Sequence, residues 1–183
     1  EMCIRDRAQG LVSDDVVTAL SVKGSNVVRE HIYRNPDGSI NRKSVKLCDG
    51  AWRQMRYENG TFTPGVKGVS NVPYGADRLA EDFSDKLAFI FEGEKDVERG
   101  WDRGLLATCN VGGAKNWKDE LNAHLKDRTV CIVPDNDKAG TNHAQKVYAS
   151  LTKSGIDCFI LWDYREGLPD KGDFSDWMDA NND

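Results

Sequence analysis

Acidic side chains recur at three places where the chain leaves an apolar run or enters a helix. Glu92 follows the run in "FIFEGEKD", and Asp135 and Asp137 follow the run in "VPDNDKAG". Asp173 stands in the third stretch, "KGDFSDW". Asp135 and Asp137 are separated by a single residue. Carboxylates this close repel and raise each other's pKa unless a cation or a hydrogen-bond donor lies between them. Because carboxylate oxygens without His or thiolate partners suit Mg²⁺ or Mn²⁺, the pattern predicts a divalent-cation site.

Short apolar runs alternate with helical stretches after Ser84, and they predict the elements that carry these acids. The runs comprise residues 87–91, 105–109, 130–133 and 158–161. Apolar strands separated by helices indicate a parallel sheet that is covered on both faces. Ligands of such sheets bind beyond the carboxyl ends of the strands. We therefore expect the first two acidic sites to meet at one edge of the sheet.

Apolar residues at helical spacing predict the covering helices. One helix is marked by Trp117, Leu121 and Leu125. A second helix has an i, i+3, i+4, i+7 face made by Ala144, Val147, Tyr148 and Leu151. The stretch "PYGADRLAED" predicts a short helix that bridges the two halves of the chain.

The half of the chain before Ser84 has a different pattern and a different charge. Residues 27–72 predict β structure, with turns at "NPDG" and at Asn59-Gly60, which is a strong hairpin signal. Between Lys23 and Ser70, nine Lys or Arg against four Asp or Glu give +5, so the remainder carries −10 of the total of −5. A basic segment beside an acidic one indicates a polyanion partner and a separate metal-holding region.

Composition excludes several classes of protein. No apolar run approaches the roughly 20 residues that span a bilayer, so no membrane partner is expected. The start, "EMCIRDRAQG", lacks the apolar segment of a secretory signal, and residues 1–22 are expected to be irregular or artefactual. The five cysteines form no CxxC pair, which argues against a zinc site or a disulfide framework. Cysteines without a disulfide framework indicate a reducing, cytoplasmic compartment.

The acidic and Gly-rich stretches also fit other interpretations. An EF-hand loop that starts at Asp135 fails at Ala139 and Lys146, and no Walker A loop occurs. A short acidic loop taken alone is more often a solvated face than a metal site. The stretch "NVGGAKNW" is either a plain strand-to-helix turn or a phosphate cradle.

Together these motifs resemble a TOPRIM domain, the catalytic fold shared by bacterial-type primases, type IA and type II topoisomerases and some nucleases. The resemblance covers about Lys86 to Met178 and rests on "EGEKD", "DND" followed by "KAG", and "KGDFSDW". It implies an α/β fold, with a Rossmann-like parallel sheet flanked by helices and preceded by a small β-rich subdomain. The implied domains are a basic, primase-like β-rich subdomain at 23–84 and the TOPRIM catalytic domain at 85–183.

Details such as "DNDKAG" and "NVGGAKNW" are similar to the primases and primase-helicases of bacteria, phages and plasmids. This implies a Mg²⁺- or Mn²⁺-dependent nucleotidyltransferase that synthesises short primers on single-stranded DNA from nucleoside triphosphates, with a replicative helicase as partner in cis or in trans. Neither a zinc-binding module nor a P-loop helicase is seen, so a stand-alone core or a fragment is expected. The alternatives are a TOPRIM-type nuclease and a non-catalytic module that binds DNA or docks a helicase. A topoisomerase is disfavoured because the chain lacks room for the domain with the tyrosine nucleophile.

The resemblance also implies roles for individual residues. Glu92, Asp135 and Asp137 are the implied catalytic residues, and together with Asp173 they are the implied metal ligands. Glu92 is either a metal ligand or a general base. Supporting or phosphate-contacting roles fall to Glu94, Lys95, Asp96, Lys138 and Asp176, although Lys95 and Lys138 are equally well ordinary surface lysines.

The basic β-rich segment would bind the nucleic-acid backbone. The candidate residues are Arg34, Arg42, Lys43, Arg53 and Arg56. Trp52 and Tyr57 would stack on bases, although a large aromatic residue such as Trp52 is about as often part of a core. His31, His124 and His143 show no partner pattern and are expected to be structural or surface residues.

Overall fold

Two structural units make up the described part of the chain, which comprises residues 27–81 and 87–181 of this computed structural model. The first unit contains residues 27–32 and 40–70, and the second contains residues 33–39 and 71–181. The expected irregular segment at 1–22 lies outside the described residues.

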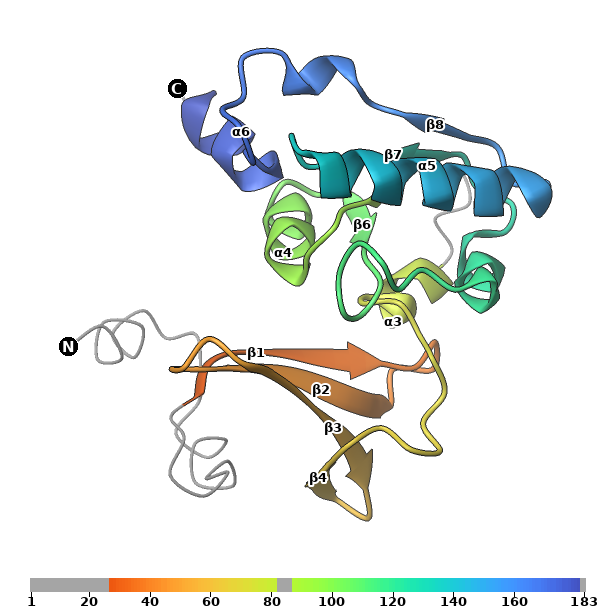
Figure 1. The fold of residues 1–183 in the computed structure, drawn as a ribbon. Helices are drawn as coiled ribbons and strands as arrows, with labels where there is room; N and C mark the ends of the chain where they lie inside the picture. Colours follow the sequence, from red (N-terminus) through yellow and green to blue (C-terminus); the bar gives the residue numbers. More distant parts are fainter. Residues whose placement is uncertain (1–26, 82–86, 182–183) are drawn as a thin grey trace. The chain divides into compact units, whose positions relative to one another are not determined.

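The first unit is built on a four-stranded sheet with the order β1-β2-β3-β4 (Figure 1). Its strands are β1 (Val27–Arg34), β2 (Ile40–Leu47), β3 (Trp52–Glu58) and β4 (Thr61–Pro64). The β2–β3 and β3–β4 pairs are antiparallel. Both predicted turns are present: Gly38 closes the first with a positive φ of 81°, and Asn59 and Gly60 close the second with φ of 50° and 79°. Two successive residues with positive φ are what a tight hairpin requires, and Asn and Gly tolerate this conformation best.

The second unit contains a parallel sheet with the strand order β6-β5-β7-β8. Its strands and helices are β5 (Ala88–Ile90), α4 (Glu94–Asp102), β6 (Leu106–Thr108), β7 (Val130–Ile132), α5 (Lys138–Lys153), β8 (Cys158–Ile160) and α6 (Phe174–Ala180). The short helix α3 (Ala76–Ala80) precedes the sheet, as predicted, and the 3₁₀ helix η3 (Asp163–Arg165) lies between β8 and α6. The three pairings β5–β6, β5–β7 and β7–β8 are all parallel, so the predicted parallel sheet is confirmed.

Successive side chains of a strand point to opposite faces, and in β5, β6 and β7 both faces are largely buried, whereas Phe159 of the edge strand β8 is 43% exposed. Ile90 and Ile132 pack in one cluster with Val147 and Leu151 of α5. Phe91 and Cys131 pack in a second cluster with Val97 of α4 and Met178 of α6. The apolar runs therefore have no polar face, as the sequence indicated.

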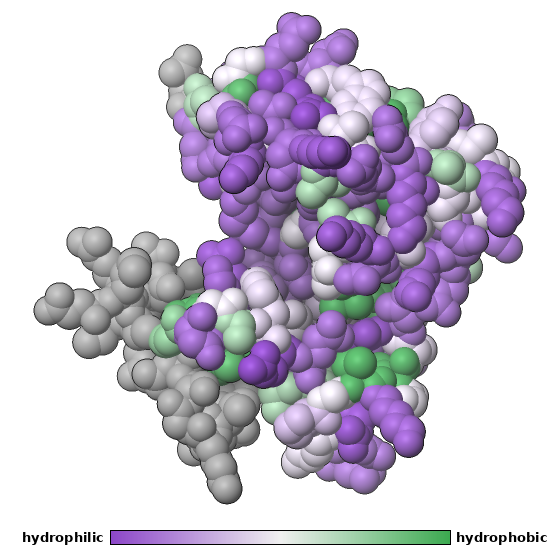
Figure 2. Space-filling model, in the orientation of Figure 1, coloured by the Kyte–Doolittle hydropathy of each residue, from purple (hydrophilic) through white to green (hydrophobic). Residues whose placement is uncertain are grey.

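One helix differs from the expected form. The segment marked by Trp117, Leu121 and Leu125 forms the 3₁₀ helix η2 (Asp119–Leu125), and Trp117 precedes it as a buried residue whose indole N–H donates to the Asn122 side chain. No helix in the described ranges is long and apolar enough to cross a membrane. On the face shown in Figure 2, hydrophilic residues predominate and hydrophobic ones form small, separate groups.

Candidate active site

The first two acidic sites meet where β5 and β7 end side by side. Glu92 stands two residues after β5, and Asp135 stands three residues after β7. The backbone N–H of Asp135 donates a hydrogen bond to Oε1 of Glu92 at 3.1 Å. Parallel pairing of these neighbouring strands thus joins two residues that are far apart in the sequence.

Asp137 begins helix α5, and its Oδ1 accepts a hydrogen bond from the backbone N–H of Gly140 at 2.7 Å. A Cβ atom at Gly140 would lie 2.4 Å from Oε1 of Glu92 and 2.5 Å from the carbonyl oxygen of Asp135. Only glycine fits this close approach, so Gly140 is a site residue that sequence reasoning missed. The available signal was a glycine inside a helical pattern, where it costs up to about 1 kcal/mol relative to alanine. Lys138 is exposed in the first turn of the same helix.

Asp173 begins helix α6 and is held by two neighbours. It forms a capping box with Asp176, in which each carboxylate accepts the other residue's backbone N–H at 3.0 Å. Nζ of Lys95 donates to Oδ2 of Asp173 at 2.5 Å and lies 4.0 Å from Asp96. The first and third acidic sites are therefore linked by an ion pair.

Asp96 fastens α4 to α6. It is 4% exposed, and its Oδ1 accepts hydrogen bonds from the backbone N–H and the hydroxyl of Ser175, at 3.0 Å and 2.5 Å. Glu94 makes a separate contact, since its Oε1 accepts a hydrogen bond from the hydroxyl of Tyr33 at 2.7 Å. Glu94 and Asp96 thus anchor helix α4, and their support of a metal site stays a prediction.

Asn136, the middle residue of "DND", fastens the loop that leads to Asp173. Its Nδ2 donates to the carbonyl oxygens of Leu168 and Pro169, each at 3.0 Å, and its Oδ1 accepts from Nε of Arg165 at 3.0 Å. Its backbone exchanges two further hydrogen bonds with Lys171 and Gly172. Asn136 therefore positions the third acidic site beside the second. The sequence carried no signal for this role, because the contacts are long-range.

The carboxylates influence one another's protonation. Burial, followed by the charges of Glu92 and Asp96, raises the pKa of Asp135 to about 8. Burial also raises the pKa of Glu92 and of Asp96. For Lys95, burial opposes the charged form, but the hydrogen bond to Asp173 and the surrounding carboxylates outweigh it and raise its pKa. The site thus has an excess of negative charge that a bound cation would stabilise.

The donor set suits a hard cation, although it is not preassembled. No described residue donates a hydrogen bond to the Asp135 carboxylate, so both of its oxygens are free to bind a ligand. Within residues 27–81 and 87–181, no three His, Cys, Asp or Glu side chains are already grouped as a metal site. Binding by Glu92, Asp135, Asp137 and Asp173 therefore stays a prediction.

In the first unit, the structure corrects two of the five basic candidates. Arg42 and Lys43 are 4% and 1% exposed. Lys43 lies on the apolar face of the sheet, 3.4 Å from Glu30 and 4.2 Å above the ring of Phe62. Arg42 donates to the side chain of Asn41 and to the carbonyl oxygen of Ser70. Neither cation is on the open surface that DNA binding requires, because both serve contacts within the unit.

The remaining basic candidates reach solvent. Arg53 is exposed, whereas Arg34 and Arg56 are half-buried. Trp52 is 45% exposed, which excludes it from the core. It stacks on His31 with ring centroids 5.9 Å apart, and its cross-strand partner Lys46 lies 6.0 Å from the ring. Arg56 shares this face of the sheet with Trp52, since both occupy alternate positions of β3.

Fold and site together define a class of protein. The model of the Toprim-like family matches residues 79–178, more than half of the chain, and the chain belongs to this family. This span includes all the acidic residues of the candidate site.

Solved structures place the fold more narrowly. The Aquifex aeolicus primase (zinc-binding and RNA polymerase domains) has a TM-score of 0.64 at 16% identity, with 88% of this chain and 40% of that chain covered. A DNA primase domain from Pseudomonas aeruginosa has a TM-score of 0.62 at 18% identity, with 84% and 47% covered. The primase fragment of the bacteriophage T7 primase-helicase protein has a TM-score of 0.58 at 18% identity, with 96% and 67% covered.

The chain has the fold of these primase domains, and it spans less than half the length of the first two. A search of curated proteins finds no match.

Proposed function

We propose that this chain is a primase-type nucleotidyltransferase core that joins nucleotides into short primers on single-stranded DNA. The observation that carries the proposal is the contact between Glu92 and Asp135 at the carboxyl edge of a primase-like parallel sheet, with Asp137 in the adjoining helical turn. This role would include a replicative helicase as partner, in cis or in trans, and a cytoplasmic location.

Glu92, Asp135, Asp137 and Asp173 would hold Mg²⁺ or Mn²⁺. The free Asp135 carboxylate and the all-carboxylate donor set support this assignment. A divalent cation bound there would neutralise the triphosphate and lower the pKa of the attacking 3′-hydroxyl.

The chain's own residues would position the reactants. Glu92 fixes the Asp135 backbone through the 3.1 Å hydrogen bond and so orients that carboxylate. The side chain of Lys95 is 42% exposed and is held by Asp173. Its ammonium would meet a phosphate oxygen of the incoming nucleotide, because it is both anchored and open to solvent.

The first unit would bind the template through the exposed side chains on the sheet face that carries Trp52. Trp52 would stack on a base, while Lys46 and Arg56, which share its face of the sheet, would contact phosphates. Affinity for single-stranded DNA should fall as salt rises, with a logarithmic slope of roughly −0.7 for each phosphate contact. Replacing Arg56 by alanine should reduce the slope, whereas Lys153→Ala on helix α5 serves as control. A slope that is flat, or that is unchanged in the Arg56 variant, would argue against this surface.

The catalytic proposal is tested by incubating the protein with single-stranded DNA, labelled nucleoside triphosphates and Mg²⁺ or Mn²⁺. Asp135→Asn should reduce oligonucleotide synthesis by at least about 100-fold, the upper end of losses caused by outer-shell changes at metal sites. The matched control is Asp127→Asn, because Asp127 is exposed, precedes β7, and has a φ of 61° that asparagine tolerates.

Synthesis that survives Asp135→Asn would refute the assignment. DNA shortening without synthesis would indicate the nuclease, and DNA binding without either product would indicate a non-catalytic module.

A further inference from the structure

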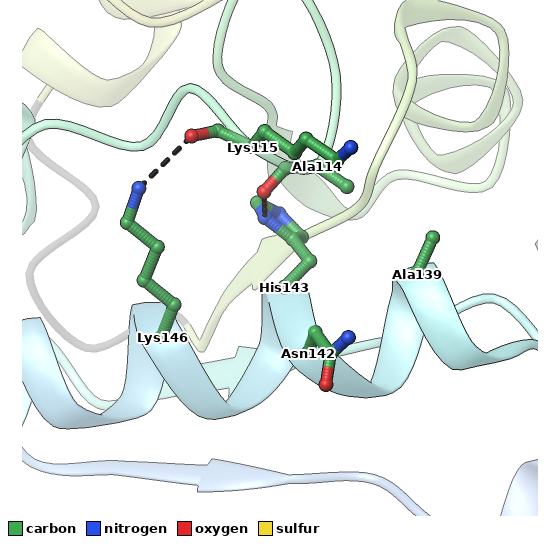
Figure 3. A pocket seen from close by; sticks show the side chains of 6 residues that line it. All are labelled: Ala114, Lys115, Ala139, Asn142, His143 and Lys146. Atoms are coloured by element: carbon green, nitrogen blue, oxygen red, sulfur yellow. Dashed lines mark hydrogen bonds between the residues drawn. The ribbon is translucent and has the colours of Figure 1, made fainter.

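A small pocket lies between helix α5 and the Gly-rich turn that follows β6 (Figure 3). Its volume is about 220 Å³. It is lined by Ala114 and Lys115 from the turn and by Ala139, Asn142, His143 and Lys146 from the helix. The four helix residues follow an i, i+3, i+4, i+7 pattern, so they form one face of α5. No acidic residue is among the six.

His143 contributes an unpaired ring nitrogen. The residue is 2% exposed, and its Nδ1 lies 2.7 Å from the carbonyl oxygen of Ala114. A carbonyl oxygen only accepts hydrogen bonds, so Nδ1 carries a hydrogen and donates it. Nε2 then bears the lone pair in the neutral ring, and it has no partner among the described residues. An unsatisfied buried polar atom in a pocket wall indicates a missing ligand group.

Two lysines make the pocket electropositive. Nζ of Lys146 donates to the carbonyl oxygen of Lys115 at 2.9 Å, which brings the helix and the turn together (Figure 3). Two cations in a pocket whose six lining residues include no carboxylate favour an anion. The turn keeps its shape through Gly112 and Gly113, whose φ values of 80° and 73° are disfavoured for other residues.

We propose that this pocket binds a phosphate group, with Lys115 and Lys146 supplying charge and Asn142 and His143 supplying hydrogen bonds. The volume of about 220 Å³ is below the roughly 300–1,000 Å³ of pockets that enclose whole small molecules, so a single phosphate fits better than a complete nucleotide. A protonated phosphate oxygen would donate to Nε2 of the neutral imidazole, or the anion would favour the imidazolium form. The proposal does not depend on catalysis at the acidic site.

The test is a titration of the metal-free protein with inorganic phosphate in the presence of EDTA. Binding is measured by calorimetry and by the NMR signals of the His143 ring. We expect saturable binding that shifts these signals. The double variant Lys115→Met/Lys146→Met should bind about tenfold more weakly, since each exposed ion pair contributes modestly. Lys153→Met, on the same helix but outside the pocket, should bind like the parent.

The variant His143→Asn tests the role of Nε2 apart from that of Nδ1. Its side-chain amide can still donate to the carbonyl oxygen of Ala114, but it has no counterpart of Nε2. It should fold normally and bind phosphate more weakly. Displacement of phosphate by a nucleoside triphosphate would identify a nucleotide as the source of the group, and displacement by abasic single-stranded DNA would identify the backbone. Phosphate binding that is absent, or that is equal in parent, double variant and His143→Asn, would overturn the proposal. Asp135→Asn should leave phosphate binding intact, so failure of the catalytic proposal can be distinguished from failure of the phosphate-site proposal.

Discussion

Replacing Gly140 by alanine tests the close packing at the centre of the acidic site. The added Cβ would lie 2.5 Å from the Asp135 carbonyl oxygen, whereas ordinary contact begins at 3.4 Å, so one side must retreat by 3.4 − 2.5 = 0.9 Å. Rotating the Glu92 side chain cannot relieve this clash, because two of the three crowded atoms belong to the Asp135 backbone. Helix α5 must therefore move away from the end of β7.

Two opposing effects set the size of the change in stability. Alanine gains up to about 1 kcal/mol over glycine in a helix, and overpacking costs about 1–3 kcal/mol. Since the obstruction is backbone, we expect the upper part of that range and a net destabilisation of about 1–2 kcal/mol. For a chain of this size that corresponds to a fall in Tm of roughly 2–8 °C. A displacement near 1 Å should reduce primer synthesis by roughly 100-fold.

Thermal unfolding and primer synthesis measure both effects. Ala149→Gly is the matched control, because Ala149 is exposed on the same helix and reports helix propensity alone. It should lose up to about 1 kcal/mol in stability and keep its activity. A Gly140→Ala protein that is more stable than the parent and equally active would refute the reasoning.

Two further outcomes are expected. Asn136→Asp loses both donors to the 168–172 loop, so it should be destabilised by about 1–2 kcal/mol in urea unfolding and bind Mn²⁺ more weakly. The exposed Asn181→Asp serves as control, and equal Mn²⁺ affinity in the two variants would contradict a positioning role. Because the pKa of Asp135 is raised to about 8, above its unfolded value near 3.9, the folded state binds this proton more tightly. The resulting stability of the metal-free protein is complete below about pH 4 and is lost as the pH rises to about 8. Urea unfolding at pH 5 and pH 8 should show a smaller pH difference for Asp135→Asn, and an unchanged difference would contradict this.

The parallel sheet could be predicted because each of its strands is a short, largely apolar run. Strands that are buried on both faces require consecutive apolar residues, so the strands that contain Ile90 and Ile132 can be recognised from the local sequence. The Asn59-Gly60 hairpin is equally local, since its positive φ values depend on the two residues in the turn. The meeting of Glu92 with Asp135 followed from a general rule for parallel sheets.

Burial of charged residues could not be predicted in the same way. Arg42 and Lys43 belong to a basic segment and were expected to face solvent. Their burial depends on cross-strand neighbours, such as Phe62 beneath Lys43, which a charge count does not include. Whether Trp52 lies in the core or on the surface could not be predicted for the same reason.

The sequence by itself determined the elements, their alternation, and the chemistry of the acids at the strand ends, because these depend on residue type and short-range spacing. Only the tertiary structure decided that Gly140 leaves room for Glu92, that Asn136 holds the loop before Asp173, and that the Nε2 atom of His143 is unpaired. Each of these facts is a distance between atoms of segments that are remote along the chain. Such distances are set by packing of the whole unit rather than by any local preference.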